Sequence, residues 1–387
     1  MERREILKKF LEEGFQLEKG ALDFFSENEN RIEEFFKKTR ETEAPPVITL
    51  DFLQKFLAKP LETEVLKTFK KRSGEISVSD ISLTLNKKYE RISNFLEKRL
   101  ELINLISIGK IGPRTKNFSI IGMVRERNEY ENSLVLEDRT GEIKVFLEEQ
   151  DIKKVVEDEI LGVVCNRKED SFYAEKIIFP DIPLKREIKR SESDFKVIFV
   201  SDFHLESGTN YIHKLVDFIE REKFDVVFVL GDVSSKQRDI MDFFSSFNSK
   251  EKIFVKGEVD ENVDIDAKIF EEFAFLKIES LNILLLHGSI IEKYVKIFGS
   301  VKDTLLELLK KRHICPSFDI NLSVEDENLI IDPVPDIFAC AHFHEPSLTN
   351  YKGTTILSTG SFITEPIYWI INLKSREILK LDLREKL

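Results

Sequence analysis

Five short, continuous apolar runs constrain the fold of this chain more than any other feature of its sequence. Runs of this kind are typical of β-strands that are buried on both faces of a sheet. Between the first two runs, residues 210–223 repeat apolar side chains at helical spacing. We therefore expect a layered α/β sheet with polar residues at its strand ends, where open α/β sheets commonly bind ligands. The runs are residues 196–200, 225–230, 253–256, 283–286 and 336–340.

Carboxylates and histidines lie where these strands are expected to end, and they make phosphoester chemistry the leading hypothesis. Imidazole nitrogens and carboxylate oxygens are ligands for Mn, Fe or Zn. Two such ions about 3.5 to 4 Å apart would activate a water molecule and neutralise the charge that develops on a phosphate. The candidate metal-binding and catalytic residues are Asp202, His204, Asp232, Glu258, Asp260, His287, His342 and His344.

The spacing of these residues gives each of them an expected place. Asp202 and His204 are two residues apart at a strand end, so they project to the same side and can bind one ion. Asp232 follows a glycine that permits a tight turn, and its carboxylate can bridge two ions. Later histidines would hold the second ion, and the last of them would return to the first ion: His287, His342 and His344.

These elements resemble the signature of the calcineurin-like metallophosphoesterases, which reads D-x-H, G-D, G-N-H-D, a lone His and G-H-x-H. Glu258 stands where that family has an asparagine ligand, and the resemblance implies that it binds the second ion through oxygen. Val259 stands where the family has a histidine beside the leaving group, so a general-acid contribution of roughly 10²- to 10⁴-fold would be missing or supplied elsewhere. Asp260 is expected to order this turn. The implied cofactors are two divalent metal ions (Mn, Fe or Zn), with Mn favoured for nuclease activity.

A narrower resemblance covers the region after His287. Residues 309–316 (LKKRHICP), 328–335 (NLIIDPVP) and 336–344 (DIFACAHFH) resemble the small subunit of archaeal D-family DNA polymerases. The resemblance implies a two-metal 3′-5′ exonuclease that acts on DNA, at single-stranded or primer 3′ ends. It also implies a heterodimer or larger assembly with a large catalytic polymerase subunit in DNA replication.

The region before the phosphoesterase pattern agrees with this resemblance. From residue 117 to 147, short β-runs with a tight turn at 138–141 predict a small barrel, which resembles the OB-fold of the polymerase small subunits. Upstream, an apolar stripe over residues 89–105 predicts a helix. The expected organisation is multidomain α+β: an N-terminal helical segment, a linker at 41–46, a helical region, an OB-fold β-barrel and a calcineurin-like layered α/β metallophosphoesterase domain. The expected domain limits are 1–40, 47–110, 115–184 and 195–387.

Length and charge limit the possible functions. The chain has 387 residues, 42% of them hydrophobic, and can therefore bury more than one core. The net charge of −12 argues against a surface that binds nucleic acid throughout, and it suits a subunit that leaves most DNA contact to a larger partner. No apolar run approaches the roughly 20 residues that span a bilayer, so we expect no membrane contact and a cytoplasmic protein.

Two other functions stay open from the sequence alone. The first is a catalytically degenerate scaffold subunit, because Glu258 and Val259 depart from the family pattern. The second is a free-standing metallophosphodiesterase or a recombination-type nuclease. His313 keeps two interpretations, a polar anchor of its loop and a contact with DNA or a partner. The basic stretch 185–190 also keeps two, a solvated linker between the barrel and the phosphoesterase and a local patch that binds nucleic acid.

Overall fold

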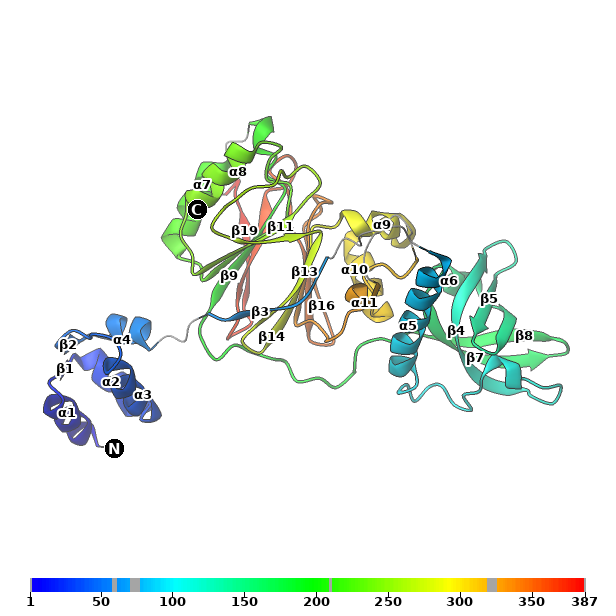
Figure 1. Cartoon of the computed structure of the whole chain (residues 1–387), viewed down its shortest axis with the longest axis horizontal. Helices are drawn as coiled ribbons and strands as arrows, with labels where there is room; N and C mark the ends of the chain where they lie inside the picture. Colours follow the sequence, from blue (N-terminus) through cyan, green and yellow to red (C-terminus); the bar gives the residue numbers. More distant parts are fainter. Residues whose placement is uncertain (1, 58–60, 70–76, 209–210, 319–325, 386–387) are drawn as a thin grey trace. The chain divides into compact units, whose positions relative to one another are not determined.

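The computed structural model describes residues 2–57, 61–69, 77–208, 211–318 and 326–385 (Figure 1). The chain divides into two compact units, Met1–Leu61 and Glu62–Leu387. The expected multidomain architecture is confirmed, since the second unit contains both a closed β-barrel and a layered α/β domain. Within the described residues, no helix is long and apolar enough to cross a membrane.

The first unit is a small helical domain with a phenylalanine core. Phe10 is fully buried, and its ring centroid lies 4.8 Å from that of Phe25 and 5.3 Å from that of Phe35. We expect a linker at 41–46, but β1 and β2 pair in parallel and join residues 47–48 to this unit, and Phe56 of α4 packs on Phe35. The elements are α1 (Arg3–Glu12), β1 (Gln16–Leu17), α2 (Lys19–Glu27), α3 (Asn30–Thr39), β2 (Val47–Ile48) and α4 (Leu50–Phe56).

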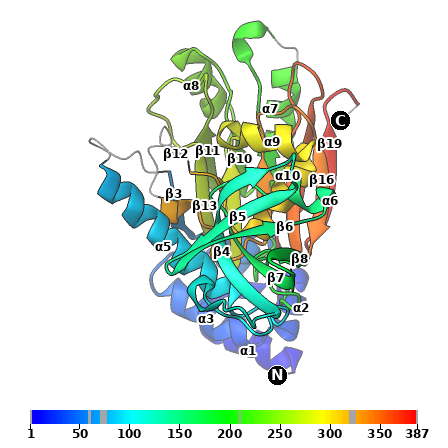
Figure 2. The same ribbon diagram turned by 90° about the vertical axis from the view of Figure 1, so that its right-hand side faces the viewer.

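The barrel lies in the fully described stretch 77–208, and in Figure 2 it faces the viewer. Its strand order is β4-β5-β6-β8-β7, with β7 returning to β4 to close it, which is consistent with an OB-like fold. The turn at 138–141 forms because the carboxylate of Asp138 accepts hydrogen bonds from the backbone N–H groups of Thr140 (2.7 Å) and Gly141 (3.1 Å). The elements are β4 (Asn117–Asn128), β5 (Ser133–Asp138), β6 (Gly141–Phe146), α6 (Glu149–Ile152), β7 (Ile160–Lys168) and β8 (Ser171–Ile178).

The α/β domain consists of two six-stranded sheets in the described part of the chain, packed face to face (Figure 1). The five apolar runs form β9, β10, β11, β14 and β15. One sheet has the order β12 (Lys268–Glu271), β11 (Glu251–Lys256), β10 (Val226–Val229), β9 (Lys196–Val200), β18 (Ile367–Asn372), β19 (Ile378–Asp382). The other has the order β16 (Ser347–Tyr351), β17 (Thr354–Ser358), β15 (Ile337–Cys340), β14 (Leu281–Leu286), β13 (Phe273–Ile278), β3 (Thr63–Thr68).

Alternation of side chains along each strand explains why the sheets are apolar on both faces. In β10, Val227 and Val229 join a core with the helices α7 (Tyr211–Glu222) and α8 (Gln237–Ser245). Their neighbour Phe228 points to the other face and stacks on Phe199 at 4.7 Å between ring centroids. The second sheet is covered in the same way by α9 (Glu292–Phe298) and α10 (Val301–Lys311). The domain is therefore a four-layered sandwich.

Strand β3 is the main departure from the sequence-based expectation. It lies in the expected helical region 47–110, yet it pairs antiparallel with β13 at the edge of the second sheet. The following helix, α5 (Val78–Leu96), starts where Ser77 and Asp80 form a capping box. It ends earlier than the apolar stripe indicates, and Leu100 (93% exposed) shows that this end of the predicted helix was wrong.

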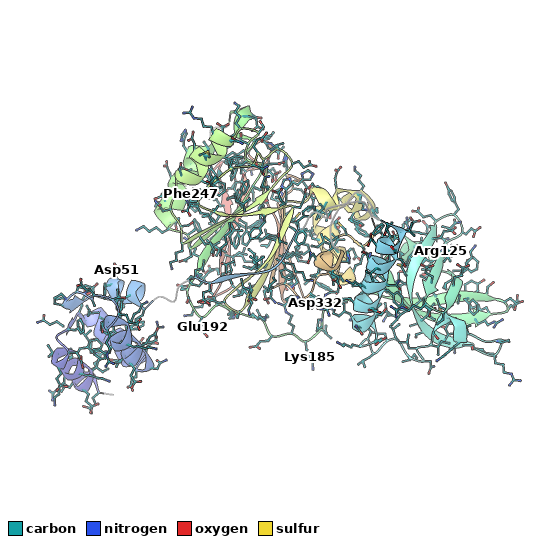
Figure 3. All side chains as sticks on the ribbon, viewed as in Figure 1. Asp51, Arg125, Lys185, Glu192, Phe247 and Asp332 are labelled. Atoms are coloured by element: carbon teal, nitrogen blue, oxygen red, sulfur yellow. The ribbon has the colours of Figure 1, made fainter. Side chains whose placement is uncertain are left out.

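The stretch 309–316 lies where the sandwich meets α5 and the barrel. Lys311 Nζ lies 2.7 Å from Glu159 Oε2 of the barrel domain, and both side chains are buried. The guanidinium of Arg312 lies 4.3 Å from the ring centroid of Phe95 on α5. Asp332, labelled in Figure 3 on the side that faces α5, pairs with Arg91 at 2.8 Å. His313 is only 1% exposed and its Nδ1 accepts the backbone N–H of residue 315, which favours the structural interpretation of this histidine.

The stretch 185–190 also has structural contacts. Arg186 pairs with the buried carboxylate of Asp336 and donates to the carbonyl of Pro335 (2.9 Å). Arg190 donates to the carbonyl of Lys374 (3.0 Å). These contacts fasten the segment between the barrel and β9 to the sandwich.

We expect Lys311→Met to lower the free energy of unfolding by about 3 kcal/mol, because it leaves the buried Glu159 carboxylate without its cation. The matched control is Lys310→Met, whose pair with Glu307 is partly exposed and should contribute less than about 1 kcal/mol. Urea denaturation of both variants measures the difference. Equal losses in the two variants would contradict this account of the junction.

Candidate metal centre

The structure brings six of the eight candidate site residues into two groups among the described residues. In each group, one ligand atom from every member lies within 4.8 Å of the others. The residues follow β9 and β10 in the first sheet and β14 and β15 in the second, so the centre lies where both sheets end. The groups are Asp202, His204 and His344, and Asp232, His287 and His342.

Five of these six residues have a left-handed backbone. Such positive φ angles are uncommon for residues other than glycine, and they cluster at functional sites because the surrounding structure must hold them. Loop-to-loop hydrogen bonds hold them here, since the N–H of Asp202 donates to Gly231 O (3.0 Å) and that of His204 to Asp232 O (3.1 Å). The φ angles are 53° at Asp202, 46° at His204, 52° at Asp232, 74° at His342 and 56° at His344.

Hydrogen bonding directs His287 toward the centre. Its Nδ1 lies 2.9 Å from Leu230 O, and because a carbonyl only accepts, this nitrogen carries the proton. Its Nε2 then faces Asp232 Oδ2 (3.5 Å) and His342 Nδ1 (3.2 Å), so three potential ligand atoms converge. A backbone carbonyl that fixes the tautomer in this way is common behind metal-binding histidines.

The charges in this group are strongly coupled. Burial disfavours the charged form of His287, but the Asp232 carboxylate outweighs burial and raises the pKa of His287 to about 9. Burial likewise opposes ionisation of Asp232, and His287 reverses this effect and lowers the pKa of Asp232 to about 2. Burial and the charge of His287 lower the pKa of His342. The Asp232 carboxylate is therefore ionised, as a metal ligand must be, and His287 must release the proton on Nε2 before that nitrogen can bind an ion.

The group of Asp202, His204 and His344 has unsatisfied polar atoms that suit a cation. Asp202 Oδ1 and His204 Nε2 are buried and have no hydrogen-bond partner within the described part of the chain. His344 Nε2 lies 3.5 Å from Asp202 Oδ1. A buried carboxylate oxygen without a partner is costly unless a cation meets it. The donor atoms thus fit a divalent ion held by one carboxylate and two imidazoles.

Two glycines allow the loops to come this close. A Cβ at Gly231 (φ 84°) would collide with His287 Nδ1 and lie 2.7 Å from Gly257 N. A Cβ at Gly257 would collide with Asp232 Oδ1 and lie 2.8 Å from His287 Cε1. Real Cβ atoms essentially never approach so closely, so both positions require glycine.

Asp260 and Glu258 have different surroundings from the six grouped residues. Asp260 is buried, and its two carboxylate oxygens accept hydrogen bonds from the backbone N–H groups of residues 232, 233, 234 and 257 at 2.8 to 3.2 Å. It is thus placed to order the turn rather than to bind an ion. Glu258 is exposed and lies outside both groups, although its charge acts on His342. The N–H of Val259 donates to Asp232 Oδ1 (3.3 Å).

Comparison with known proteins first defines the class of the sandwich. Residues 195–367 match the calcineurin-like phosphoesterase superfamily domain. The sandwich is accordingly a calcineurin-like phosphoesterase domain, a fold that generally binds divalent metals. Among solved structures, a Streptococcus pneumoniae protein described as a predicted phosphoesterase is 18% identical, with a TM-score of 0.33, and covers 51% of this chain and 94% of its own.

Over a longer region the chain is similar to curated archaeal DNA polymerase II small subunits. That of Methanothermobacter thermautotrophicus is 26% identical over an alignment of 366 positions, which covers 75% of this chain and 73% of the relative. That of Archaeoglobus fulgidus is 24% identical over an alignment of 421 positions, which covers 90% of this chain and 82% of the relative. The similarity therefore extends well beyond the phosphoesterase domain.

We expect Gly257→Ala to weaken binding of Mn²⁺ at least tenfold, because the added methyl group displaces the Asp232 carboxylate and the His287 ring. Gly112→Ala is the matched control, since the nearest atom to its Cβ would be 4.0 Å away. Isothermal titration calorimetry with Mn²⁺ compares the variants with the parent chain. Unchanged affinity in Gly257→Ala would exclude this arrangement as the metal centre.

Proposed function

We propose that this chain is the small subunit of an archaeal D-family DNA polymerase, also called DNA polymerase II, and that it hydrolyses DNA ends in the 3′-5′ direction for a separate large subunit. The observation that carries the proposal is the pair of ligand groups at the common end of both sheets. The similarity to DNA polymerase II small subunits over 75 to 90% of the chain supplies the biological setting. The limits 115–184 for the barrel and 195–387 for the main part of the phosphoesterase domain are part of the same proposal.

The candidate residues would have the following roles in binding metal ions. Asp202, His204 and His344 would hold one divalent ion, and His287 and His342 would hold the other. Asp232 would supply its carboxylate to both ions, and Glu258 would add an oxygen ligand from the exposed edge of the centre. Divalent ions supply an activated water and neutralise charge at the phosphate. Mn²⁺ is favoured for nuclease activity, and Fe and Zn suit the same donor atoms.

The protein itself contributes positioning. The carbonyl of Leu230 sets the tautomer of His287, and the carboxylate of Asp260 holds the loop that carries Asp232. Neither contact depends on a bound ion. Pre-organised ligands of this kind spare the protein from reordering its loops when the substrate arrives.

Val259 should lower the rate of the proposed hydrolysis. Its side chain cannot give a proton to the leaving oxygen, so the proton must come from solvent or from another group. The missing proton donor is also consistent with a second candidate function, a scaffold subunit that retains the fold without turnover. A free-standing phosphodiesterase is disfavoured by the buried Lys311–Glu159 contact, which fastens a barrel to the phosphoesterase domain.

Degradation of 3′-labelled single-stranded DNA with Mn²⁺ tests the proposed nuclease. The parent chain should shorten the DNA, alone or with the large subunit, and the double variant Asp232→Ala, His344→Ala should not, because each substitution removes a proposed ligand from one group. Absence of activity in both settings would favour the scaffold function. Activity that survives in the double variant would place the chemistry elsewhere.

Val259→His tests whether the missing acid limits the rate. If it does, turnover should rise, by up to roughly 10²-fold, with a fall at high pH as the new imidazole loses its proton. Val259→Asn is the control, because it is polar but cannot act as an acid near neutral pH. Equal rates in the parent chain and Val259→His would show that proton donation is not limiting.

A further inference from the structure

A groove of about 380 Å³ lies between α7 and α8, the two helices that cover the first sheet. We call it the α7–α8 groove. None of the six grouped metal-ligand candidates lines it, so it is separate from the candidate metal centre. Its lining residue Leu205 directly follows His204 in the chain. Its lining includes an apolar set, Leu205, Ile212, Val216 and Phe243, and an acidic set, Asp217, Asp239 and Asp242.

The carboxylates of the acidic set are largely free to pair with cationic side chains of another protein. Asp217 forms no ion pair within the part of the chain that the structure describes, and it is exposed. Asp242 faces Arg238 at 3.7 Å, but both side chains are mostly exposed, and such a pair contributes little. Asp239 accepts one hydrogen bond, from Ser234 Oγ (3.0 Å), which leaves its negative charge uncompensated.

Charge decides which occupant suits the groove. Three carboxylates repel the phosphates of DNA, because nucleic-acid binding rests on neutralising those phosphates with cations. Small anionic molecules are disfavoured for the same reason. A basic amphipathic helix satisfies both sets, since it lays apolar side chains at i, i+3 and i+4 into a groove and presents lysine or arginine to the acidic edge.

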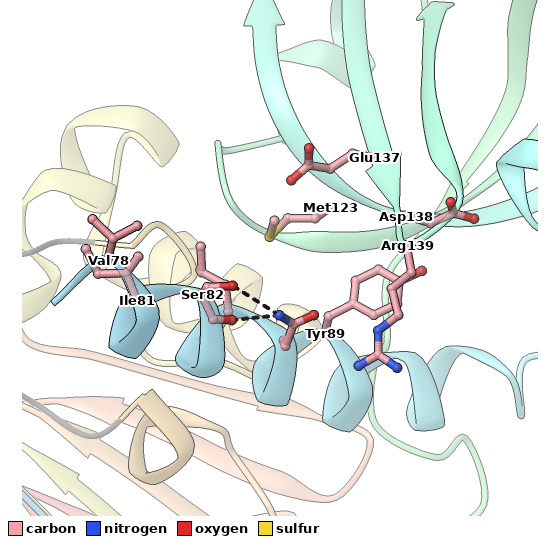
Figure 4. Close-up of a pocket in the computed structure, with 10 residues that line it drawn as sticks. Val78, Ile81, Ser82, Tyr89, Met123, Glu137, Asp138 and Arg139 are labelled. Carbon is pink, nitrogen blue, oxygen red and sulfur yellow. Dashed lines mark hydrogen bonds between the residues drawn. The ribbon is translucent and has the colours of Figure 1, made fainter.

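A second hollow of about 380 Å³, between α5 and the barrel, lacks this selectivity (Figure 4). Val78, Ile81 and Tyr89 give it an apolar side, as in the α7–α8 groove. Its polar residues carry mixed charge, however, because Arg139 lines it together with Glu137 and Asp138. Charge therefore identifies a partner for the α7–α8 groove and none for the hollow.

We infer that the α7–α8 groove docks a basic amphipathic helix of the large polymerase subunit, an inference that rests on the proposed function for the identity of the partner. Docking there would place the large subunit beside the loop that carries His204. The interaction would weaken with salt, because its specificity comes from exposed charges.

The test uses the full chain, tagged and co-expressed with the large subunit from the same genome. The variant is Asp217→Asn with Asp242→Asn, which keeps side-chain size and removes two charges. The matched control, Glu169→Gln with Asp170→Asn, removes two exposed charges from the barrel loop between β7 and β8. Affinity is measured at about 0.15 M salt.

The groove variant should bind the large subunit about tenfold more weakly than the control, as expected for the loss of two charge contacts. Equal binding by the groove variant and the control would overturn the inference and leave the proposed function intact. If even the parent chain fails to bind the large subunit, the proposed partnership is wrong.

In that case a synthetic amphipathic helix of about 18 residues, built from leucine and lysine, decides whether the groove takes basic helices. Weaker binding of this peptide to the groove variant than to the control would support the groove as a site for a basic helix. Equal binding to both would overturn it. Circular dichroism of the variants, with the parent chain as reference, establishes that both are folded.

Discussion

The buried carboxylate of Asp260 is the contact on which the candidate metal centre depends. It accepts backbone hydrogen bonds from the loop after β10 and from Gly257 after β11, and so ties two parallel strands together at their ends. Burial raises the pKa of Asp260, while these N–H groups act in the opposite direction and stabilise its charge. Asp232 takes its position from this clamp, and His287 takes its orientation from Asp232 and the carbonyl of Leu230. The ligands are thus held by backbone contacts within a rigid sheet edge.

The sequence predicts much of the phosphoesterase domain because its strands are apolar on both faces. A run such as 196–200 can be recognised as a strand without knowledge of the strands that pair with it, and the structure has β9 at the same bounds. The types of the candidate ligands are also visible in the sequence. Their backbone geometry is not, because aspartate and histidine adopt left-handed and right-handed conformations without a local signal, and only loop-to-loop contacts select φ 53° at Asp202.

Elements that depend on distant partners are harder to predict. Thr63–Thr68 alternates charged and apolar residues too weakly to indicate a strand, and it becomes one because β13 offers an unpaired edge. The helix expected over residues 89–105 has good apolar periodicity, yet it ends at Leu96, and among the apolar residues that follow, Leu100 and Ile103 are exposed. The side chain of Glu258 shows the same limit, since the family position predicts a ligand but does not reveal that this residue is exposed and lies outside both ligand groups.

The position of β3 makes the phosphoesterase domain discontinuous in sequence. The chain contributes one edge strand, leaves to form α5 and the barrel, and returns at β9 to build the rest of both sheets. A fragment that begins at β9 would lack this strand and expose the backbone of β13, and an open, apolar sheet edge favours association with other chains. The phosphoesterase domain and the barrel are therefore best regarded as one folding unit, in which evolution can vary the barrel only while both of its connections to the sandwich are kept.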